Sequence, residues 1–267
     1  MDTSVAVIES PMTSDSCHWN AITLGYTRWG QGAPLLLLHG LGGNGENWYY
    51  QSRAFSRDRE VITVDLPGHG RSSGRLVPFG DYWQAIEAVL DHLSLEKVSI
   101  CGLSKGARAG IAFAARHPER VERIAIVAAF LRLEHTDREA RLSLYDLLVA
   151  PGGPRRWADA LLSQMSVCDH PAIVRGFHRS LDHIDPAHIR RIFGELLDHD
   201  QREEFASLTC PVLLMRGDRD AFVPAYCLEE MLMLQPKAEV VRFPALGHLP
   251  YLEDSASINT ALERFLP

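Results

Sequence analysis

Short apolar runs rich in branched residues alternate with helix-length amphipathic stretches along most of this 267-residue chain. Apolar runs separated by helices predict the strands of a parallel sheet that is buried on both faces. The predicted strands are Ile22–Arg28, Leu35–Leu38, Val61–Asp65, Val98–Cys101, Ile124–Ala128, Val212–Met215 and Val240–Phe243. The predicted helices lie near Phe79–Leu93, Lys105–His117, Ala225–Leu234 and Ala256–Phe265. We therefore expect an α/β fold with helices on both faces of a mostly parallel sheet.

This alternation stops between Leu131 and Leu208. The interval holds helical, charge-rich sequence such as RRWADALLSQM and IRRIFGELLDH, and PGGP interrupts it. A strand pattern returns at TCPVLLMRG. We therefore expect a helical cap, residues 131–208, inserted over the carboxyl edge of a core formed by residues 1–130 and 209–267.

Composition argues against several classes of partner. The formal net charge is -7, and this balance gives no basic face for nucleic acid. No segment approaches the roughly 20 apolar residues of a membrane helix, and the N-terminal MDTSVAVIESPM lacks the basic start of a secretory signal. The five cysteines are scattered without a C-x-x-C, which indicates reduced thiols. We expect a cytoplasmic monomer or homodimer with no membrane or nucleic-acid partner.

The stretch LLLLHGLGGNG contains a G-x-G-x-x-G formed by Gly40, Gly42 and Gly45, and Asp65 closes the next apolar run. This spacing occurs in dinucleotide-binding turns, where a helix N-terminus faces a pyrophosphate. Glu46 directly follows the last glycine and would repel the phosphates. A strand also precedes the loop, so it does not open the fold. We therefore disfavour a cofactor dehydrogenase and predict that Asp65 fixes the turn after its strand.

A second glycine motif, GLSKG, directly follows the strand VSIC and opens the helix KGARAGIAFAARH. This is the strand–turn–helix context of a G-x-S-x-G nucleophile elbow. Gly102 and Gly106 would keep side chains out of the strand–helix crossing. Ser104 would then be held in a strained conformation, with its hydroxyl above the sheet edge and next to the positive end of the helix.

A serine hydroxyl is a weak nucleophile and needs a base that is oriented by an acid. The chain order of this architecture is serine, acid, histidine, and His248 is the one histidine after the late acids. Asp218 and Asp220 both follow the strand VLLM. We prefer Asp220 because it precedes the helix start at Val223–Pro224.

The glycine loop acquires a different role in this setting. Its backbone N–H groups can face the carbonyl oxygen of an acyl substrate. The N–H of Leu41, together with that of Lys105, would form an oxyanion hole. His39 and His69 flank glycines in loops, and we expect them to hydrogen-bond to main chain.

The motifs HGLGG, DLPGHGRS, GLSKG, GDRDAFVP and GHLPYLE occur in this order over nearly the whole chain outside the insertion. This set resembles the α/β-hydrolase superfamily, and the insertion resembles the cap of that family. Within it, the sequence is similar to 3-oxoadipate enol-lactonases and small carboxylesterases of the pimeloyl methyl-ester esterase kind. The resemblance implies Ser104 as nucleophile, His248 as base, Asp220 as orienting acid, and Leu41 and Lys105 as oxyanion donors. Lys105 departs from the family, which usually has an uncharged residue there, so we expect its charge near the pocket.

The implied reaction is hydrolysis of a small-molecule ester or lactone without metal or organic cofactor. We expect the substrate pocket to include Gly40 and the aromatic side chains of Trp48, Phe130 and Trp157; core packing is the alternative for each aromatic. Met165 and Phe177 are further pocket candidates. One or two cap arginines are candidates for binding a substrate carboxylate: Arg155, Arg156, Arg175, Arg179, Arg190 and Arg191. The cap histidines lack metal-binding spacing and are expected on solvated helix faces: His170, His178, His183, His188 and His199.

Ser104 itself separates the chain from haloalkane dehalogenases and epoxide hydrolases of this fold, which have an aspartate at the elbow. Two other functions remain compatible with the motifs. One is a C–C bond hydrolase or lyase of the same fold. The other is a ligand receptor that hydrolyses its ligand slowly.

Overall fold

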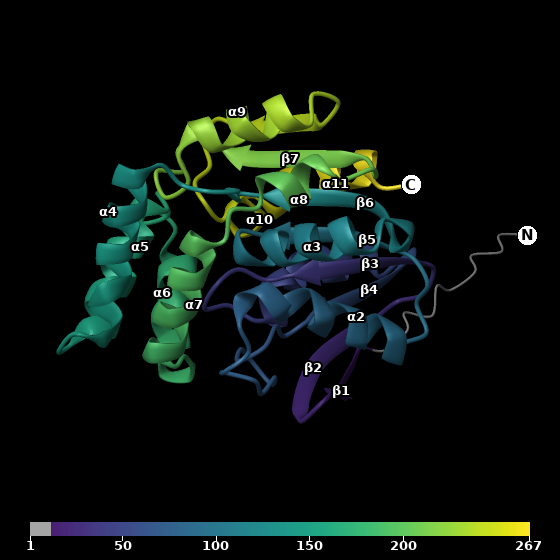
Figure 1. The fold of residues 1–267 in the computed structure, drawn as a ribbon, viewed down its shortest axis with the longest axis horizontal. Coiled ribbons are helices and arrows are strands. Elements are labelled where there is room, and N and C mark those ends of the chain that lie inside the picture. Colours follow the sequence, from purple (N-terminus) through teal and green to yellow (C-terminus); the bar gives the residue numbers. More distant parts are fainter. Residues whose placement is uncertain (1–11) are drawn as a thin grey trace, which may run out of the picture.

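The computed structural model describes residues 12–267, which form one eight-stranded sheet with helices on both sides and a helical cap at one end (Figure 1). The strand order is β1-β2-β4-β3-β5-β6-β7-β8. The pairs β1/β2 and β2/β4 are antiparallel, and all other pairs are parallel. The expectation about an N-terminal signal lies outside the described residues, apart from Met12.

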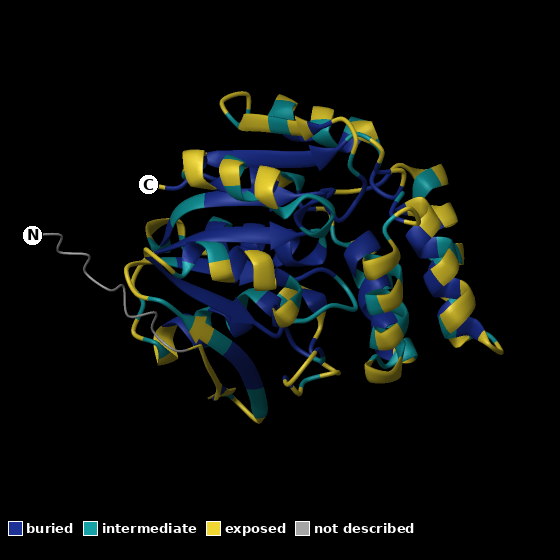
Figure 2. Ribbon diagram, turned by 180° about the vertical axis from the view of Figure 1, so that it is seen from behind, coloured by how far each residue is buried: buried dark blue, intermediate teal, exposed yellow. Residues whose placement is uncertain are grey.

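All seven predicted strands are present, and Figure 2 shows the centre of the sheet as buried. The strands are β1 (Thr13–Trp19), β2 (Ile22–Trp29), β3 (Ala33–Leu38), β4 (Arg59–Val64), β5 (Val98–Leu103), β6 (Val121–Val127), β7 (Val212–Gly217) and β8 (Glu239–Phe243). Every residue of β4, β5 and β7 is buried, which explains their continuous apolar runs. The sequence analysis missed β1, because this edge strand reads TSDSCHW and buries only Cys17.

Helices cover both faces of the sheet, as expected. On one face lie α2 (Tyr82–His92), α3 (Lys105–Arg116) and α8 (Arg202–Ala206), and α9 (Ala225–Leu234) packs beside α8. On the other face lie α1 (Tyr49–Phe55), α10 (Pro250–Glu253) and α11 (Ser255–Phe265), which contact one another. Because α3 is rich in alanine and glycine, it packs so closely that Lys105 to Ala114 are all buried.

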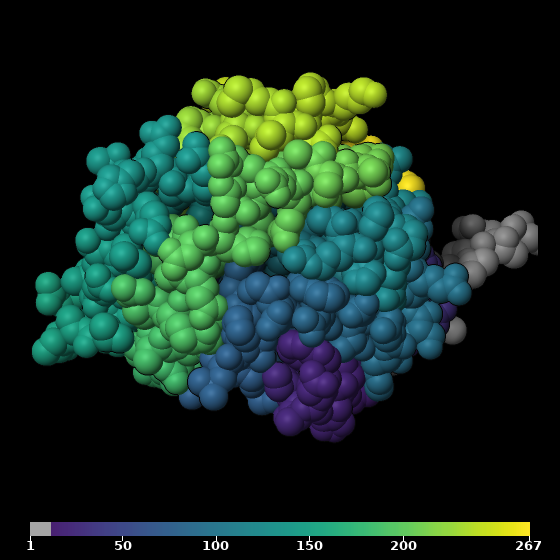
Figure 3. All heavy atoms as spheres, viewed as in Figure 1, coloured from purple at the N-terminus to yellow at the C-terminus, as the bar shows by residue number. Residues whose placement is uncertain are grey.

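The cap lies at the carboxyl ends of the parallel strands, where the arrowheads of β3 and β7 point in Figure 1. Between β6 and β7 the described chain forms helices and no strand: α4 (His135–Asp146), α5 (Gly153–Gln164), α6 (Pro171–Ser180), α7 (Pro186–Asp198) and α8. Figure 3 shows the cap helices as a block that is continuous with the core surface. Arg108 of α3 joins the two parts, because its buried guanidinium donates to the Leu196 and Leu131 carbonyls and to the Gln201 side chain.

None of the helices described for residues 12–267 is both long enough and apolar enough to cross a membrane.

Candidate active site

Ser104 occupies the sharp turn between β5 and α3. Its backbone has φ 49° and ψ -111°, a left-handed conformation that is strained for any residue with a side chain. The Ser104 N–H donates to the Val127 carbonyl of β6 at 2.9 Å, and its carbonyl accepts from Arg108 N–H of α3 at 3.1 Å. The sheet and the helix therefore hold the strained turn from both sides.

Two glycines make this turn possible by allowing backbone to approach backbone. A Cβ on Gly102 would lie 2.5 Å from the Cα and N of Ala107. A Cβ on Gly106 would lie 2.3 Å from the Leu38 carbonyl oxygen. The G-x-S-x-G spacing is thus a packing requirement of the strand–helix crossing, as the sequence indicated.

The loop after β8 brings His248 to Asp220, which lies in the loop after β7. His248 Nδ1 is 2.7 Å from Asp220 Oδ2, and both residues are buried. The other Asp220 oxygen, Oδ1, accepts the N–H groups of Phe222 at 2.9 Å and Val223 at 3.0 Å. Asp218 points elsewhere and pairs with Arg242 Nε at 2.8 Å. Asp220, the acid that the sequence favoured, is therefore the one in contact with His248, and Asp218 is not.

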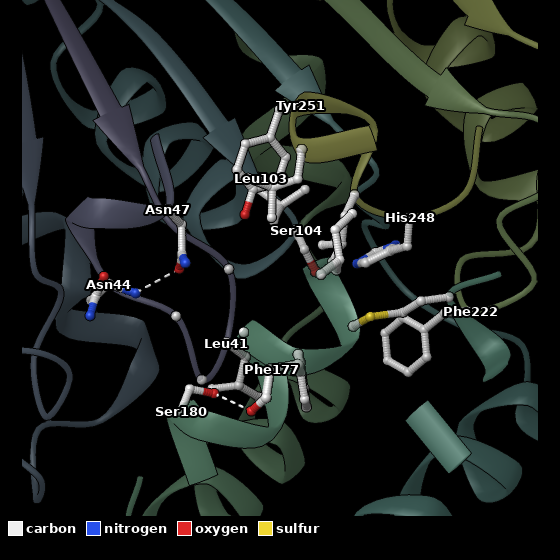
Figure 4. A pocket seen from close by; sticks show the side chains of 18 of the residues that line it. Leu41, Asn44, Asn47, Leu103, Ser104, Phe177, Ser180, Phe222, His248 and Tyr251 are labelled. Atoms are coloured by element: carbon white, nitrogen blue, oxygen red, sulfur yellow. Dashed lines mark hydrogen bonds between the residues drawn. The ribbon is translucent and has the colours of Figure 1, made fainter. Parts of the chain in front are cut away.

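Ser104 and His248 line the same cavity, and the His248 ring points toward the serine hydroxyl (Figure 4). The cavity has a volume of about 340 Å³ and lies between the glycine loop, α6 and the histidine loop. Its apolar lining residues are Leu41, Leu103, Met165, Ala172, Ile173, Phe177, Phe222, Leu249 and Leu252. The lining residues with a polar group in the side chain, besides Ser104 and His248, are Asn44, Asn47, Tyr50, Tyr145, Ser180 and Tyr251. Among the described lining residues there is no Asp, Glu, Lys or Arg.

The two predicted oxyanion donors have no acceptor within residues 12–267. Neither the N–H of Leu41 nor that of Lys105 donates to a main-chain or side-chain group there. Lys105 is the first residue of α3, so its N–H is one of the orphan donors at the positive end of that helix. Leu41 lines the cavity.

A sequence profile of the alpha/beta hydrolase fold matches residues 33–183, more than half of the chain. The chain belongs to the α/β-hydrolase fold family.

Two named relatives and one solved structure show the breadth of this family. The dihydrolipoyllysine-residue acetyltransferase component of an acetoin cleaving system from Pseudomonas putida is 30% identical over 88% of this chain, a match that spans 64% of that protein. A pimeloyl-(acyl-carrier protein) methyl ester esterase from Nitrosomonas europaea is 30% identical over 84% of this chain and 91% of its own length. An enol-lactonase from Burkholderia xenovorans shares the fold, with a TM-score of 0.82, 22% identity, and coverage of 94% of this chain and 99% of that one.

Three aromatic residues predicted for the pocket of this α/β-hydrolase do not line its cavity. Trp48 is fully buried and packs on Tyr251, with ring centroids 4.5 Å apart. Phe130 packs under the buried guanidinium of Arg108. Trp157 lies behind the pocket wall, in contact with rings that do line it. The core-packing alternative holds for all three, whereas Gly40 lines the cavity as expected.

The residues that line the cavity in their place include Met165, Phe177, Asn47 and Tyr145. The sequence analysis named the first two as candidates and missed the polar ones. The pocket residues of the cap could have been found from the periodicity of α6. Its lining residues, Ile173, Gly176, Phe177 and Ser180, follow a helical spacing of three and four. No comparable periodicity marks Asn47 or Tyr145.

The charge of Lys105 does not face the cavity, contrary to expectation. Its side chain is buried, and Nζ lies 3.2 Å from His69 Nε2 and 5.4 Å from the Tyr82 ring centroid. Burial lowers the pKa of Lys105 well below its usual value, and the charge of Asp65 raises it. The Lys105 amine is thus buried beside His69 and Tyr82, and Lys105 is not among the residues that line the cavity.

The loop acids and histidines serve the main chain, as expected. Asp65 accepts from the N–H groups of Gly45 at 2.7 Å and Arg71 at 2.9 Å, so each of its oxygens binds the main chain of a loop. His39 Nδ1 contacts the Gly40 carbonyl at 2.7 Å, and Nε2 accepts the Leu66 N–H at 3.0 Å. Because an amide N–H can only donate, His39 must be neutral with its proton on Nδ1.

The six cap arginines of the carboxylate hypothesis do not line the cavity. Four are exposed: Arg155, Arg156, Arg175 and Arg179. Arg190 pairs with Asp146, and Arg191 with Glu195. Among the cap histidines, His188 differs from the expected solvated position, because it is buried and its Nδ1 contacts the Arg75 carbonyl at 2.9 Å. Within the described chain, no cluster of three or more His, Cys, Asp or Glu residues could hold a metal ion.

Stability is expected to fall as the pH drops from about 6.5 toward 5.5. Burial lowers the pKa of His39 and His69 well below the usual value, and the nearby Lys105 lowers both further. Both rings therefore stay neutral in the folded protein, whereas the unfolded chain takes up a proton on each near pH 6.5. Each histidine should remove up to about 1.4 kcal/mol of the free energy of unfolding per pH unit. Urea unfolding across this range measures the slope, which His69→Gln should make shallower by the share of one histidine; a slope unchanged in that variant would contradict the assignment.

Proposed function

We propose that this α/β-hydrolase is a serine hydrolase that cleaves small, uncharged carboxylic esters or lactones. One observation carries the proposal: the buried His248–Asp220 pair faces Ser104 in a cavity that is also lined by Leu41, whose N–H lacks an acceptor in the described chain, as does that of Lys105 next to Ser104. This arrangement supplies a nucleophile, a base, an orienting acid and oxyanion donors, which together define acyl transfer.

The reaction follows from the position of each group. His248 Nε2 takes the Ser104 hydroxyl proton as Oγ attacks the ester carbonyl carbon. The N–H groups of Leu41 and Lys105 stabilise the tetrahedral oxyanion, and Asp220 stabilises the imidazolium through its Nδ1–H. The imidazolium then gives its proton to the leaving alcohol oxygen as the C–O bond breaks. Water, deprotonated by the same ring, releases the acid and restores Ser104.

The lining of the cavity favours an uncharged acyl group. Its walls are mainly apolar, and the cap arginines that would pair with a carboxylate lie outside it. An ionised carboxylate would therefore lose its hydration without gaining a cationic partner, at a cost of several kcal/mol. The names of the esterase and enol-lactonase relatives support ester and lactone chemistry as the general reaction.

A matched pair of esters tests the proposed substrate class. Methyl pentanoate and monomethyl glutarate both carry five-carbon acyl groups, but only the second ends in a carboxylate. We expect kcat/KM for methyl pentanoate to be higher by about 10²-fold, since an unpaired charge costs several kcal/mol and each 1.4 kcal/mol is tenfold. Acid release in a pH-stat measures both rates. A preference for monomethyl glutarate would refute the uncharged class.

Labelling with a fluorophosphonate separates hydrolysis from the rival functions. An activated Ser104 should form a covalent adduct with the fluorophosphonate. Repeated turnover of an ester or lactone, such as methyl pentanoate, distinguishes an enzyme from a slowly hydrolysing receptor. Absence of both the adduct and ester or lactone turnover would remove the proposal. An adduct accompanied only by C–C bond cleavage would favour the same-fold C–C hydrolase.

A further inference from the structure

The histidine loop between β8 and α10 is held by three consecutive N–H groups. Gly247 N–H donates to Glu253 Oε2 at 2.7 Å, and Leu249 N–H donates to Glu253 Oε1 at 3.0 Å. Between them, His248 N–H donates to the Met165 carbonyl at 2.9 Å. A single carboxylate therefore binds the residues on both sides of His248, while the cap binds His248 itself.

Glu253 is built into this position rather than left at the surface. Its side chain is fully buried, and the imidazole Nε2 of His170 lies 3.7 Å from Oε2. Burial raises the pKa of Glu253, and the two N–H donors lower it. An ionised carboxylate accepts stronger hydrogen bonds than a neutral group does. Two such bonds, one on each side of His248, hold the loop in one position and orientation.

On the side opposite Glu253, the histidine loop packs tightly against the cap. A Cβ on Gly247 would lie 2.1 Å from the Met165 carbonyl oxygen. The preceding cap residue, Gln164, accepts the Ala221 N–H next to Asp220 at 3.1 Å. The C-terminal end of α5, with the residue that follows it, thus contacts the loops of both the base and the acid. The histidine loop is clamped between this segment and Glu253.

We infer that Glu253 is a positioning residue for His248, and this inference rests on the proposed function. The carboxylate sets the backbone from which the imidazole extends, so that Nδ1 meets Asp220 and the other side of the ring faces Ser104. Glu253 is not among the residues that line the cavity, so we expect it not to contact substrate. Its loss should therefore impair the base and leave substrate binding largely unchanged.

The variant Glu253→Gln tests this role, because glutamine has one acceptor oxygen and turns an NH₂ group toward the second N–H. Displacement of a catalytic group by about 1 Å can cost 10²-fold in rate. We expect the rate of Ser104 labelling by a fluorophosphonate, and kcat for methyl pentanoate, to fall 10- to 100-fold, with KM within about twofold. The matched control Glu263→Gln removes an exposed carboxylate of α11 and should label at the wild-type rate.

A purely structural role would give a different pattern. It would lower the urea midpoint while the labelling rate of the folded fraction, kcat and the pH profile of kcat/KM stayed as in wild type, and this result would overturn the inference. If Glu253→Gln does not fold, Glu253→Asp keeps the charge but shortens the reach, and it should label more slowly than wild type; an unchanged rate would again overturn the inference. Wild-type protein that neither labels nor turns over an ester or lactone would instead remove the proposed function.

Discussion

Replacing Ser104 by alanine is expected to lower kcat for ester hydrolysis by about 10⁶-fold, the scale on which loss of a triad nucleophile acts. His248 and the two oxyanion donors remain in place, but no group is left to form the acyl-enzyme. Alanine has the same backbone preferences as serine at φ 49°, so the strain of the turn is unchanged. The free energy of unfolding should therefore stay within about 0.5 kcal/mol of wild type. Steady-state kinetics and urea unfolding measure the two quantities.

Ser99→Ala is the matched control for this experiment. Ser99 lies in the same strand, β5, is buried, and has no hydrogen-bond partner for its hydroxyl among the described residues. The same atom is removed, but away from the cavity, and activity should be retained. Ser104→Ala with more than about 1% of wild-type kcat would rule out the elbow serine as nucleophile, since loss of the nucleophile should leave far less.

The sequence predicted those parts of the fold that follow from burial. Strands β5 and β7 consist mainly of apolar residues because both faces of the sheet are covered, so the residues alone reveal them. Strand β1 is polar and gains its structure from pairing with β2, for which its own residues give no signal. The elbow was predictable because Gly102 and Gly106 are required by local backbone contacts.

The residues of the pocket were less predictable, because the sequence does not show whether a buried aromatic side chain lines a cavity or packs inside the core. Trp48 and Trp157 are as apolar as any pocket residue, yet they fill the core on either side of it. The contacts that hold the histidine loop were also invisible. Met165 reaches His248 through a carbonyl, which every residue carries, across more than 80 positions of chain. Only Glu253 left a trace in the sequence, as the last residue of GHLPYLE.

Asp220→Asn is expected to lower kcat by about 10⁴-fold with little change in KM, the loss that follows when a triad histidine is held in the wrong tautomer. The reason lies in the two roles of the carboxylate. Oδ1 accepts the N–H groups of Phe222 and Val223, and an asparagine oxygen would keep those bonds. Its NH₂ group must then occupy the position of Oδ2, 2.7 Å from His248 Nδ1. Because NH₂ can only donate, the ring proton moves to Nε2, and the base can no longer accept the proton of Ser104.

Asp218→Asn makes the same change two residues away and should keep kcat within about twofold, since Asp218 pairs with the exposed Arg242 at the surface. Stopped-flow or pH-stat kinetics on both variants compares the two acids directly. Comparing the two variants also separates a wrong orientation of His248 from damage to the fold. The turn at residue 220 should stay intact in Asp220→Asn, because the asparagine oxygen keeps the two N–H bonds. A larger loss of kcat from Asp218→Asn than from Asp220→Asn would reverse the assignment of the acid, and equal losses would point to damage of the shared loop rather than to the tautomer of His248.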